Sequence, residues 1–537
     1  GIVTLPQLRA FLDPDKALLS DPRLLPDIEP AIERLAAALK RRELIAIHGD
    51  FDSDGVTATA LLHLGLSALG GRTTPYIPHR TEEGHGLSMQ GLESIRGLGA
   101  SLIVTADCGI SSFAEVEAAR DMGIDVIITD HHSVPPQIPR ALAVIDPKRE
   151  DSEYPFPYLA SVGVSYKVVH ALRAMMGQPE DESSLDLVAL GTVADLAPLS
   201  GENRYLVKRG IEVLNSTTNP GIREMASMAG LSMGRLDTES ISYALAPRIN
   251  AAGRVDHAIT SYRLLTATSP TEARPLAEEL DLRNRERQKQ TADVLEQARE
   301  QAVAALEEDP LLLVGSEDYP AGVVGLAASR LVEEHHRPAI VLALGKEVSR
   351  ASARSIPEFD MIAALRRCQD LFLRYGGHSQ AAGFVILNEN LEPLRHRLMS
   401  IAEEQLAGVE LQPSIQIDLE LSLREVKGRL IKLIGLMAPF GYGNPPPTFL
   451  SRGIRVVNAR VLGDEGKHLR LKLRDGPVVW DAIGFDLGDQ ADHLAQALDI
   501  VYRIKVDHWG GRNALQLELL DLAPSCGSSE SEAAASR

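Results

Sequence analysis

The stretch HGDFDSDG (48–55) decides which fold and which chemistry to expect of this chain. It follows the apolar run LIAI (44–47), which is typical of a buried strand, and Gly55 leads into a helical segment. Carboxylates crowded this closely cannot all ionise at neutral pH unless cations or hydrogen-bond donors compensate. The stretch therefore favours a metal site. The alternative is a polar loop between strand and helix, in which one Asp caps the helix.

Two more apolar runs end in polar residues of the same kind. SLIVTADCG (101–109) reaches Asp107, and DVIITDHH (125–132) ends in an Asp-His-His triplet. Helical segments separate the three runs, so they predict repeated βαβ units and a parallel sheet. The carboxyl ends of parallel strands meet at one edge of the sheet, where ligands bind in open α/β folds. Taken alone, Asp107 could be a helix cap and the two His could be surface residues.

A fourth acid, Asp195, lies in GTVADLAP (191–198), beyond the apolar run LDLVAL (185–190). On its own it could equally be a cap or turn residue. Together, however, the acids and imidazoles gather at one edge of the sheet. That mixture of ligands suits two divalent ions.

The length of 537 residues suggests three or four domains at roughly 150 residues each. A second α/β pattern begins near residue 310, and short alternating strands after residue 411 predict a β-barrel, an OB-fold. Between them, the capped start SPTE (269–272) opens a long helix that we expect to connect two domains. The expected parts are an α/β domain with an N-terminal extension (1–268), a connecting helix (269–308), a second α/β domain (309–410), the barrel (411–523) and a disordered tail (524–537).

Composition excludes several classes of protein. Hydrophobic residues make up 44% and charged residues 24%, which excludes wholesale disorder and fibrous architectures. A net charge of −19 excludes a protein that coats nucleic acid indiscriminately, so any polyanion must be bound locally. Three cysteines and the lack of a long apolar run predict a cytoplasmic protein without a disulfide framework or a membrane span.

The polar motifs resemble a known family. HGDFDSDG, TADCG, TDHH and GTVADLAP match, in order and spacing, the four motifs of the DHH phosphoesterase superfamily. With the further motifs listed below, the resemblance extends from about residue 40 to 523 and is to the bacterial RecJ family of single-strand-specific 5′→3′ exonucleases. Relatives commonly carry Gly-Ser-Gly-Arg-Ser where this chain has ASARS (351–355). The further motifs are ALAPRINAAGR (244–254), SRASARS (349–355), RYGGHSQAAGF (374–384) and APFGYGNPPP (438–447).

The resemblance implies a two-metal site, with Mn²⁺ favoured by the His ligands and Mg²⁺ as the alternative. Asp107 would bridge the two ions, and His132 would act on the phosphate or the leaving oxygen. Asp50 and Asp130 would orient the ligands. The implied ligands are His48, Asp52 and Asp107 for one ion, and Asp54, Asp107, His131 and Asp195 for the other.

The resemblance also implies residues that hold DNA, although an Arg could form a surface ion pair and the glycines a tight turn. In the barrel, Tyr442 and Trp509 could stack on bases, whereas Trp480 and Phe485 fit a core position better. Cys108 fits small packing, because a nucleophilic Cys needs a basic partner. The candidates for binding DNA or phosphate are Arg80, Arg248, Asn250, Arg254, Ser352, Arg354, Gly376, Gly377 and His378.

The expected function is processive release of mononucleotides from the 5′ end of single-stranded DNA, in DNA repair and recombination. One alternative is a DHH phosphodiesterase for short oligonucleotides or cyclic dinucleotides, which the expected barrel argues against. Another is a non-catalytic scaffold like the replication-factor relatives, which the complete set of metal ligands argues against. The resemblance suggests single-strand binding protein and a recombination helicase as partners of a monomer.

Overall fold

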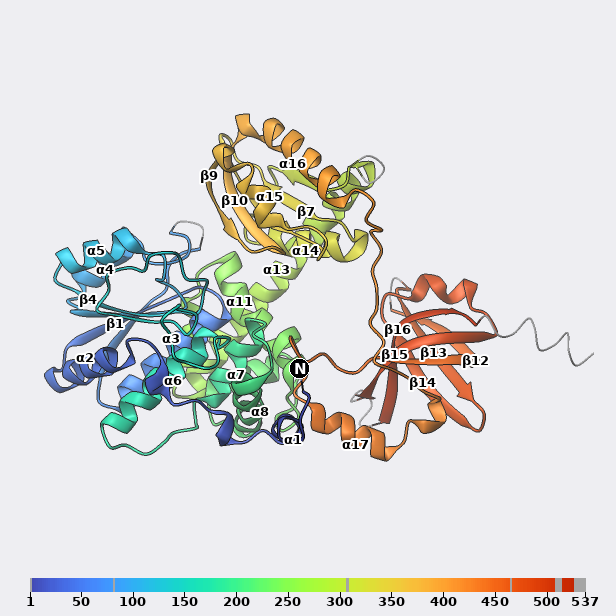
Figure 1. The fold of residues 1–537 in the computed structure, drawn as a ribbon, viewed down its shortest axis with the longest axis horizontal. Helices are drawn as coiled ribbons and strands as arrows, with labels where there is room; N and C mark the ends of the chain where they lie inside the picture. The colour runs from blue at the N-terminus through green and yellow to red at the C-terminus, as the bar shows by residue number, and fades with distance from the viewer. Residues whose placement is uncertain (1, 81–82, 306–308, 464–465, 508–513, 526–537) are drawn as a thin grey trace, which may run out of the picture. The chain divides into compact units, whose positions relative to one another are not determined.

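The computed structural model describes residues 2–80, 83–305, 309–463, 466–507 and 514–525 (Figure 1). The predicted tail from residue 526 onward, and Trp509, lie outside these residues. The chain forms two compact units, one of residues 16–413 and one that joins residues 1–15 to 414–537. Among the described helices, none has both the length and the apolar character needed to cross a membrane.

The larger unit begins with the parallel sheet that the sequence predicts. Its strand order is β2-β1-β3-β4-β5, and every neighbouring pair is parallel. The three central strands are almost entirely buried, as their apolar runs require. The strands are β1 (Leu44–Gly49), β2 (Arg72–Tyr76), β3 (Leu102–Ala106), β4 (Asp125–Thr129) and β5 (Ala143–Ile145).

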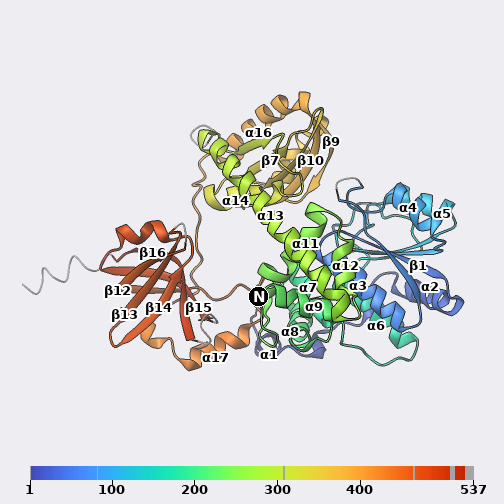
Figure 2. The ribbon, with the colours of Figure 1, turned by 180° about the vertical axis from the view of Figure 1, so that it is seen from behind.

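Helices cover both faces of this sheet (Figures 1 and 2). Helices α4 (Met89–Gly97) and α5 (Phe113–Asp121) pack on one face. Helices α2 (Ile28–Arg41), α3 (Ser53–Ala68) and α6 (Ser161–Met175) pack on the other. With both faces covered, the edge formed by the carboxyl ends of the strands is left to carry the polar residues.

A helical subdomain follows the sheet. The apolar run 185–190 forms the first part of helix α7 (Leu185–Ala194), so Asp195 follows a helix rather than a strand. The remaining helices are α8 (Gly201–Ser216), α9 (Pro220–Met228), α10 (Thr238–Ser240), a π-helical turn (Ile241–Leu245), α11 (Ala246–Val255) and α12 (Ile259–Leu265).

Helix α13 (Pro270–Ala305) is the long helix that the sequence predicts. Its first half packs against α9, α11 and α12, and its second half packs against the next domain. The backbone N–H of Glu272 donates to the Ser269 hydroxyl at 3.3 Å, and the Thr268 N–H donates to the Glu272 carboxylate at 3.0 Å. These reciprocal bonds satisfy donors that the first turn would otherwise leave free.

The second α/β domain has a mixed sheet in the order β6-β7-β8-β10-β9. Helix α14 (Val324–His335) packs with α13 on one face, and α15 (Met361–Arg366) and α16 (Leu391–Leu406) pack on the other. The strands are β6 (Leu312–Ser316), β7 (Ala339–Ala343), β8 (Val348–Arg354), β9 (Phe372–Gly377) and β10 (Ala381–Leu387).

The smaller unit contains the predicted barrel. Strands run in the order β12-β13-β14-β16-β15, and pairing of β12 with β15 closes the barrel. Helix α1 (Leu5–Leu12) packs against α17 (Gly428–Met437) of the same unit. The strands are β12 (Phe449–Leu462), β13 (His468–Asp475), β14 (Val478–Gly484), β15 (Ala497–Asp507) and β16 (Ala514–Pro524), and the short β11 (Leu419–Glu420) pairs with β12.

Candidate metal centre and phosphate pocket

The turn after β1 places three carboxylates at the edge of the sheet. The Asp50 backbone N–H donates to the Ala106 carbonyl at 3.1 Å, which ties the turn to β3. Asp52 caps α3 by accepting from the N–H groups of Asp54 at 3.0 Å and Gly55 at 3.1 Å. A Cβ at Gly55 would lie 2.8 Å from the Asp50 backbone, so this close approach requires glycine. Helix capping and a metal site are thus both present in one turn.

The turns after β3 and β4 add the next polar groups. Asp107 has φ 69°, in the left-handed region, and its N–H donates to the Thr129 carbonyl at 3.1 Å. Asp130 accepts from the N–H groups of His131 at 2.8 Å and Ile110 at 2.9 Å. Its Oδ1 also lies 2.7 Å from His132 Nδ1, so Asp130 fixes the orientation of that imidazole. Burial raises the pKa of Asp130, but the His132 contact outweighs this and leaves the pKa lowered.

Three sets of residues could each hold a metal ion, because the candidate ligand atoms within each set all lie within 4.8 Å of one another. His131 Nε2 is 3.2 Å from Asp107 and 3.8 Å from Asp54, and its Nδ1 is 3.8 Å from Asp195. His131 therefore contacts acids from three different segments. The sets are Asp54, His131 and Asp195; Asp50, Asp52 and Asp107; and Asp107, His131 and His132.

Burial and mutual repulsion make these carboxylates costly to ionise. Burial, followed by repulsion from Asp52, raises the pKa of Asp54 to about 7. Burial and repulsion from Asp54 raise the pKa of Asp107 well above its ordinary value. Burial lowers the pKa of His131 to about 3, so its imidazole is neutral, as a metal ligand must be. Bound cations would remove the cost of ionising these acids.

Unpartnered atoms support the same fit. Asp107 Oδ1 and His48 Nε2 are buried and make no hydrogen bond within the described part of the chain. Asp54 is held in place by the N–H groups of Ser161 at 2.7 Å and Val162 at 2.9 Å. Oxygen and imidazole donors in this number suit a divalent ion such as Mg²⁺ or Mn²⁺.

His48 lies at the end of β1, as the sequence predicts, but its neighbours are not the carboxylates of the three sets. Its imidazole stacks on Tyr76 with ring centroids 5.2 Å apart, and its Nδ1 lies 3.6 Å from the buried Cys108 Sγ. It belongs to none of the three ligand sets, whereas Asp50 does. Coordination by His48 stays a prediction, and the geometry adds Asp50 as a candidate ligand. Burial raises the pKa of Cys108, so the thiol keeps its proton and has no nucleophilic character.

The sequence reasoning missed His85. Its Nδ1 lies 3.2 Å from Asp50 Oδ1, and its ring centroid is 5.2 Å from that of His132. Burial lowers the pKa of His85, but Asp50 outweighs burial and raises it to about 9. His85 lies in a loop and not at the end of a strand, so no periodicity could have indicated it.

Arg254 marks the centre of a group of guanidinium groups near the carboxylates. Burial, followed by repulsion from the nearby cations Arg80, Arg287 and Arg354, lowers its pKa to about 9. Arg80 lies 4.8 Å above the Phe51 ring. Arg287, on α13, was not predicted. Four cations close together favour an anionic ligand.

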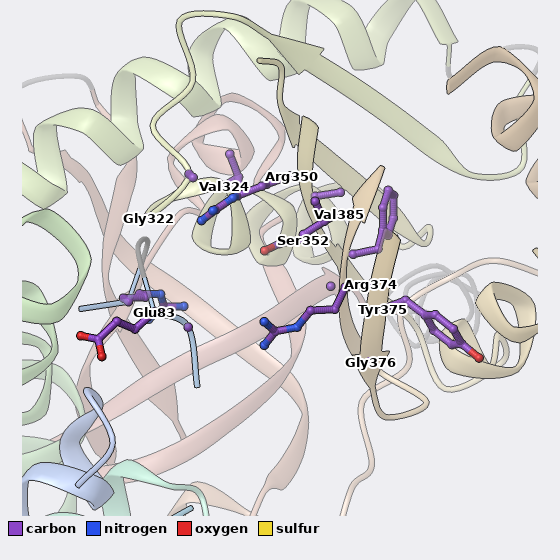
Figure 3. Close-up of a pocket in the computed structure, with 15 residues that line it drawn as sticks. Glu83, Gly322, Val324, Arg350, Ser352, Arg374, Tyr375, Gly376 and Val385 are labelled. Atoms are coloured by element: carbon purple, nitrogen blue, oxygen red, sulfur yellow. The ribbon is translucent and has the colours of Figure 1, made fainter. Parts of the chain in front are cut away.

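A pocket of about 500 Å³ lies beside this group (Figure 3). A Cβ placed at Gly325 would be 3.3 Å from Ser352 Oγ and 3.2 Å from Arg354, so both side chains lie against the start of α14. The pocket thus contains the predicted Arg80, Ser352 and Gly376, together with Arg350 and Arg374, which were not predicted. Its lining residues are Arg80, Glu83, Gly84, Ala321, Gly322, Val324, Arg350, Ala351, Ser352, Arg374, Tyr375, Gly376, Gly383, Phe384 and Val385.

Three family models match successive parts of the chain: the N-terminal domain of the DHH family at residues 44–192, the DHHA1 domain at 302–404 and the RecJ OB domain at 417–521. The single-stranded-DNA-specific exonuclease RecJ of Bacillus subtilis is 35% identical over 98% of this chain and 67% of its own length. The RecJ of Escherichia coli is 34% identical over 93% of this chain and 91% of its own length. The chain belongs to the RecJ family.

Solved structures agree with this membership. The crystal structure of RecJ from Thermus thermophilus in complex with Mn²⁺ superposes with a TM-score of 0.82 at 31% identity. That match covers 96% of this chain and 74% of the other. A second structure of the same protein, in complex with Mg²⁺, gives a TM-score of 0.75.

Some residues expected to hold DNA in this RecJ-family chain make contacts that connect its own elements. Arg248 pairs with Asp281 of α13 at 2.9 Å. Asn250 Oδ1 accepts from the Ser53 N–H at 2.8 Å and so holds the start of α3. Arg254 donates to the Gly322 carbonyl at 3.2 Å. Contact of these side chains with DNA stays a prediction.

The remaining two candidates from the second domain form a tight turn next to the pocket strand. Gly377 has φ 138°, and a Cβ there would lie 2.4 Å from the Ala381 carbonyl oxygen. The His378 N–H donates to that same carbonyl at 2.8 Å, while its side chain is exposed. The turn explains the glycine, and the exposed imidazole leaves a DNA contact as a prediction.

The barrel aromatics divide between core and surface. Trp480 packs against the barrel core, and its indole N–H donates to the Leu423 carbonyl at 3.3 Å. Tyr442 is 65% exposed. The expectation that Phe485 is a core residue was wrong: it lies one position beyond β14, is 52% exposed and contacts His468. An apolar strand pattern does not indicate where the strand stops.

Proposed function

We propose that this chain hydrolyses single-stranded DNA from its 5′ end with the help of two divalent ions, releasing mononucleotides. The observation that carries the proposal is the buried cluster of Asp and His at the strand ends, next to a pocket rich in arginine. The acids alone would repel a phosphodiester. Divalent ions and guanidinium groups together reverse that local charge.

The ligand sets described above are the candidates to hold the ions, with Asp107 common to two of them. RecJ of Thermus thermophilus has been solved with Mn²⁺ and with Mg²⁺, which supports either ion here. Imidazole ligands favour Mn²⁺. When bound, such ions activate water and neutralise charge on the phosphate during in-line displacement.

His132 is the candidate for moving a proton. Asp130 holds its Nδ1 at 2.7 Å, which leaves Nε2 to donate to the phosphate or to the leaving oxygen. Burial lowers the pKa of His132, but Asp130 outweighs this and raises it, which favours the protonated donor. Asp130 therefore acts through His132 as a positioning residue.

The pocket supplies the direction of digestion. Ser352 and Arg354 offer a hydroxyl and a guanidinium group to one phosphate, and we assign them to the 5′-terminal phosphate. The proposed surroundings are those of the family: a monomer in the cytoplasm, acting in repair and recombination with single-strand binding protein and a recombination helicase. The low cysteine content supports the cytoplasmic assignment.

The deciding experiment is digestion of an end-labelled single strand, with duplex DNA and RNA of the same sequence as comparisons. Mn²⁺-dependent release of mononucleotides from the 5′ end of the single strand alone is expected. Cleavage only of dinucleotides or cyclic dinucleotides would replace the proposal with a small-substrate phosphodiesterase. DNA binding without any hydrolysis would favour a non-catalytic scaffold.

A further inference from the structure

Ser352 lies beside an open strip on the outer face of the second domain's sheet. Gly383 of β10 pairs with Ser352 on β8 and with Gly376 on β9, so the three residues form one row across the strands. Neither glycine has a side chain, and a Cβ at Gly376 would meet nothing within 4 Å. A ligand can therefore approach the backbone here. Arg354 lies on the same face of β8, two residues after Ser352 toward the end of the strand.

The neighbouring row of residues, toward the start of β8, has an arginine at each end. Val385 of β10 pairs with Arg350 on β8 and with Arg374 on β9. Residues two apart in a strand lie on the same face at a spacing of roughly 7 Å. Arg350 therefore lies about one phosphate spacing from Ser352 along β8, whereas Arg374 lies two strands across, with its Cα roughly 12 Å from that of Ser352. Figure 3 shows both arginine side chains at the pocket.

The described lining of the pocket offers little negative charge to Arg374. Among its lining residues, Glu83 is the one carboxylate that the structure describes. Glu83 already accepts from the Tyr76 hydroxyl at 2.7 Å, the Ser88 hydroxyl at 2.7 Å and the His79 N–H at 2.8 Å. Arg374 is exposed and makes no hydrogen bond or ion pair with the described residues. Its guanidinium group is available to an anion.

We propose that Arg374, together with Arg350, binds a second phosphate of the strand whose first phosphate is held by Ser352 and Arg354. The inference rests on the proposed function and adds a position to its substrate site. Two sources can supply the second phosphate: the next phosphate of the DNA backbone, or the outer phosphates of a 5′-triphosphate end. Both present the oxygens that a guanidinium fork binds.

The test uses the full chain carrying Arg374→Gln, with Arg366→Gln as the matched control. Arg366 is exposed on α15, which packs on the opposite, buried face of the same sheet. Binding of short single strands with 5′-hydroxyl, 5′-phosphate and 5′-triphosphate ends is measured in EDTA by fluorescence anisotropy. Arg374→Gln should weaken binding about 10–150-fold, as expected for loss of a hydrogen bond to a charged group.

The salt dependence gives an independent measurement. The slope of log K against log salt is negative, and its magnitude should decrease by about 0.7 in Arg374→Gln because one phosphate contact is lost. An equal loss on all three ends identifies a backbone phosphate, and a larger loss on the triphosphate end identifies the outer phosphates. Binding equal to that of the Arg366→Gln control on every end overturns the inference. If wild type neither binds nor digests the strand, the proposed function itself fails.

Discussion

At the scale of single residues, we expect Asp107 and His132 to have separable roles. Asp107 belongs to two ligand sets, so Asp107→Ala should disturb both ions and lower turnover by several orders of magnitude. His132→Ala should keep Mn²⁺ binding but slow hydrolysis about 10²–10⁴-fold, as for loss of a single acid. Activity assays and Mn²⁺ titration by electron paramagnetic resonance check both. Near-normal activity of a folded Asp107→Ala protein contradicts the site, and equal metal loss in both variants makes His132 a ligand.

The carboxylate cluster should also make the metal-free protein sensitive to pH. Burial and repulsion raise the pKa of Asp54 to about 7, against roughly 4 in an unfolded chain. The folded state therefore keeps a proton that the unfolded state releases, so stability falls as pH rises from about 4 to about 7. Thermal unfolding in EDTA should show this fall, Mn²⁺ should reverse it most at high pH, and Asp54→Asn should reduce it. A fall in the stability of Asp54→Asn with pH as large as that of wild type would contradict the assignment.

Arg354 should recognise the terminal phosphate. Its guanidinium group lies against the start of α14 beside Ser352, and its Nη1 donates only to the Ala353 carbonyl among the hydrogen bonds of the described residues. Arg354→Ala should lose about 1.5–3 kcal/mol of binding for strands with a 5′-phosphate, the scale of a hydrogen bond to a charged group. Strands with a 5′-hydroxyl should be affected much less. Equal losses of binding free energy for strands with either 5′ end would mean that Arg354 binds an internal phosphate.

At the scale of elements, the sequence predicted what local patterns encode. The apolar runs before Asp107 and His131 gave buried strands, and the cap near Ser269 gave a long helix. Asp195 was identified by its motif, yet it follows a helix, because a short apolar run does not distinguish strand from helix. Arg374 was missed because its importance comes from strand pairing between β9 and β10, which a single sequence does not reveal.

The ion pair of Arg248 on α11 with Asp281 on α13 should contribute to the stability of the fold rather than to DNA binding. Arg248 and Asp281 side chains are 14% and 9% exposed, so Asp281→Ala leaves a largely buried cation without its partner. We expect a loss of about 3 kcal/mol in the free energy of unfolding. Glu278→Ala is the control, because its exposed pair with Arg274 on the same helix should contribute less than about 1 kcal/mol. Stability of Asp281→Ala equal to that of the Glu278→Ala control would mean that the Arg248–Asp281 pair does not hold the two helices together.

At the scale of the whole molecule, a net charge of −19 requires DNA-binding charge to be concentrated. The barrel provides one such place on β13, where buried leucines alternate with exposed Arg470, Lys472 and Arg474. These three side chains share one face because strand residues alternate in direction. A basic strand face on an OB-fold is suited to the backbone of a single strand.

Removing the barrel should therefore reduce the length of single-stranded DNA that the protein contacts without abolishing hydrolysis. Residues 16–413 form a compact unit with the ligand sets and the pocket, whereas residues 1–15 group with the barrel, so the truncation should keep 16–413. The truncated protein should still cleave very short oligonucleotides, but it should bind long strands more weakly and release fewer nucleotides per encounter. Anisotropy on strands of increasing length and single-encounter digestion measure the two effects.

Neutralising Arg470, Lys472 and Arg474 in the full chain should reproduce the loss of affinity, since it removes charge while leaving the barrel in place. A folded truncated protein that binds long strands as tightly as the full chain would mean that the barrel does not hold DNA.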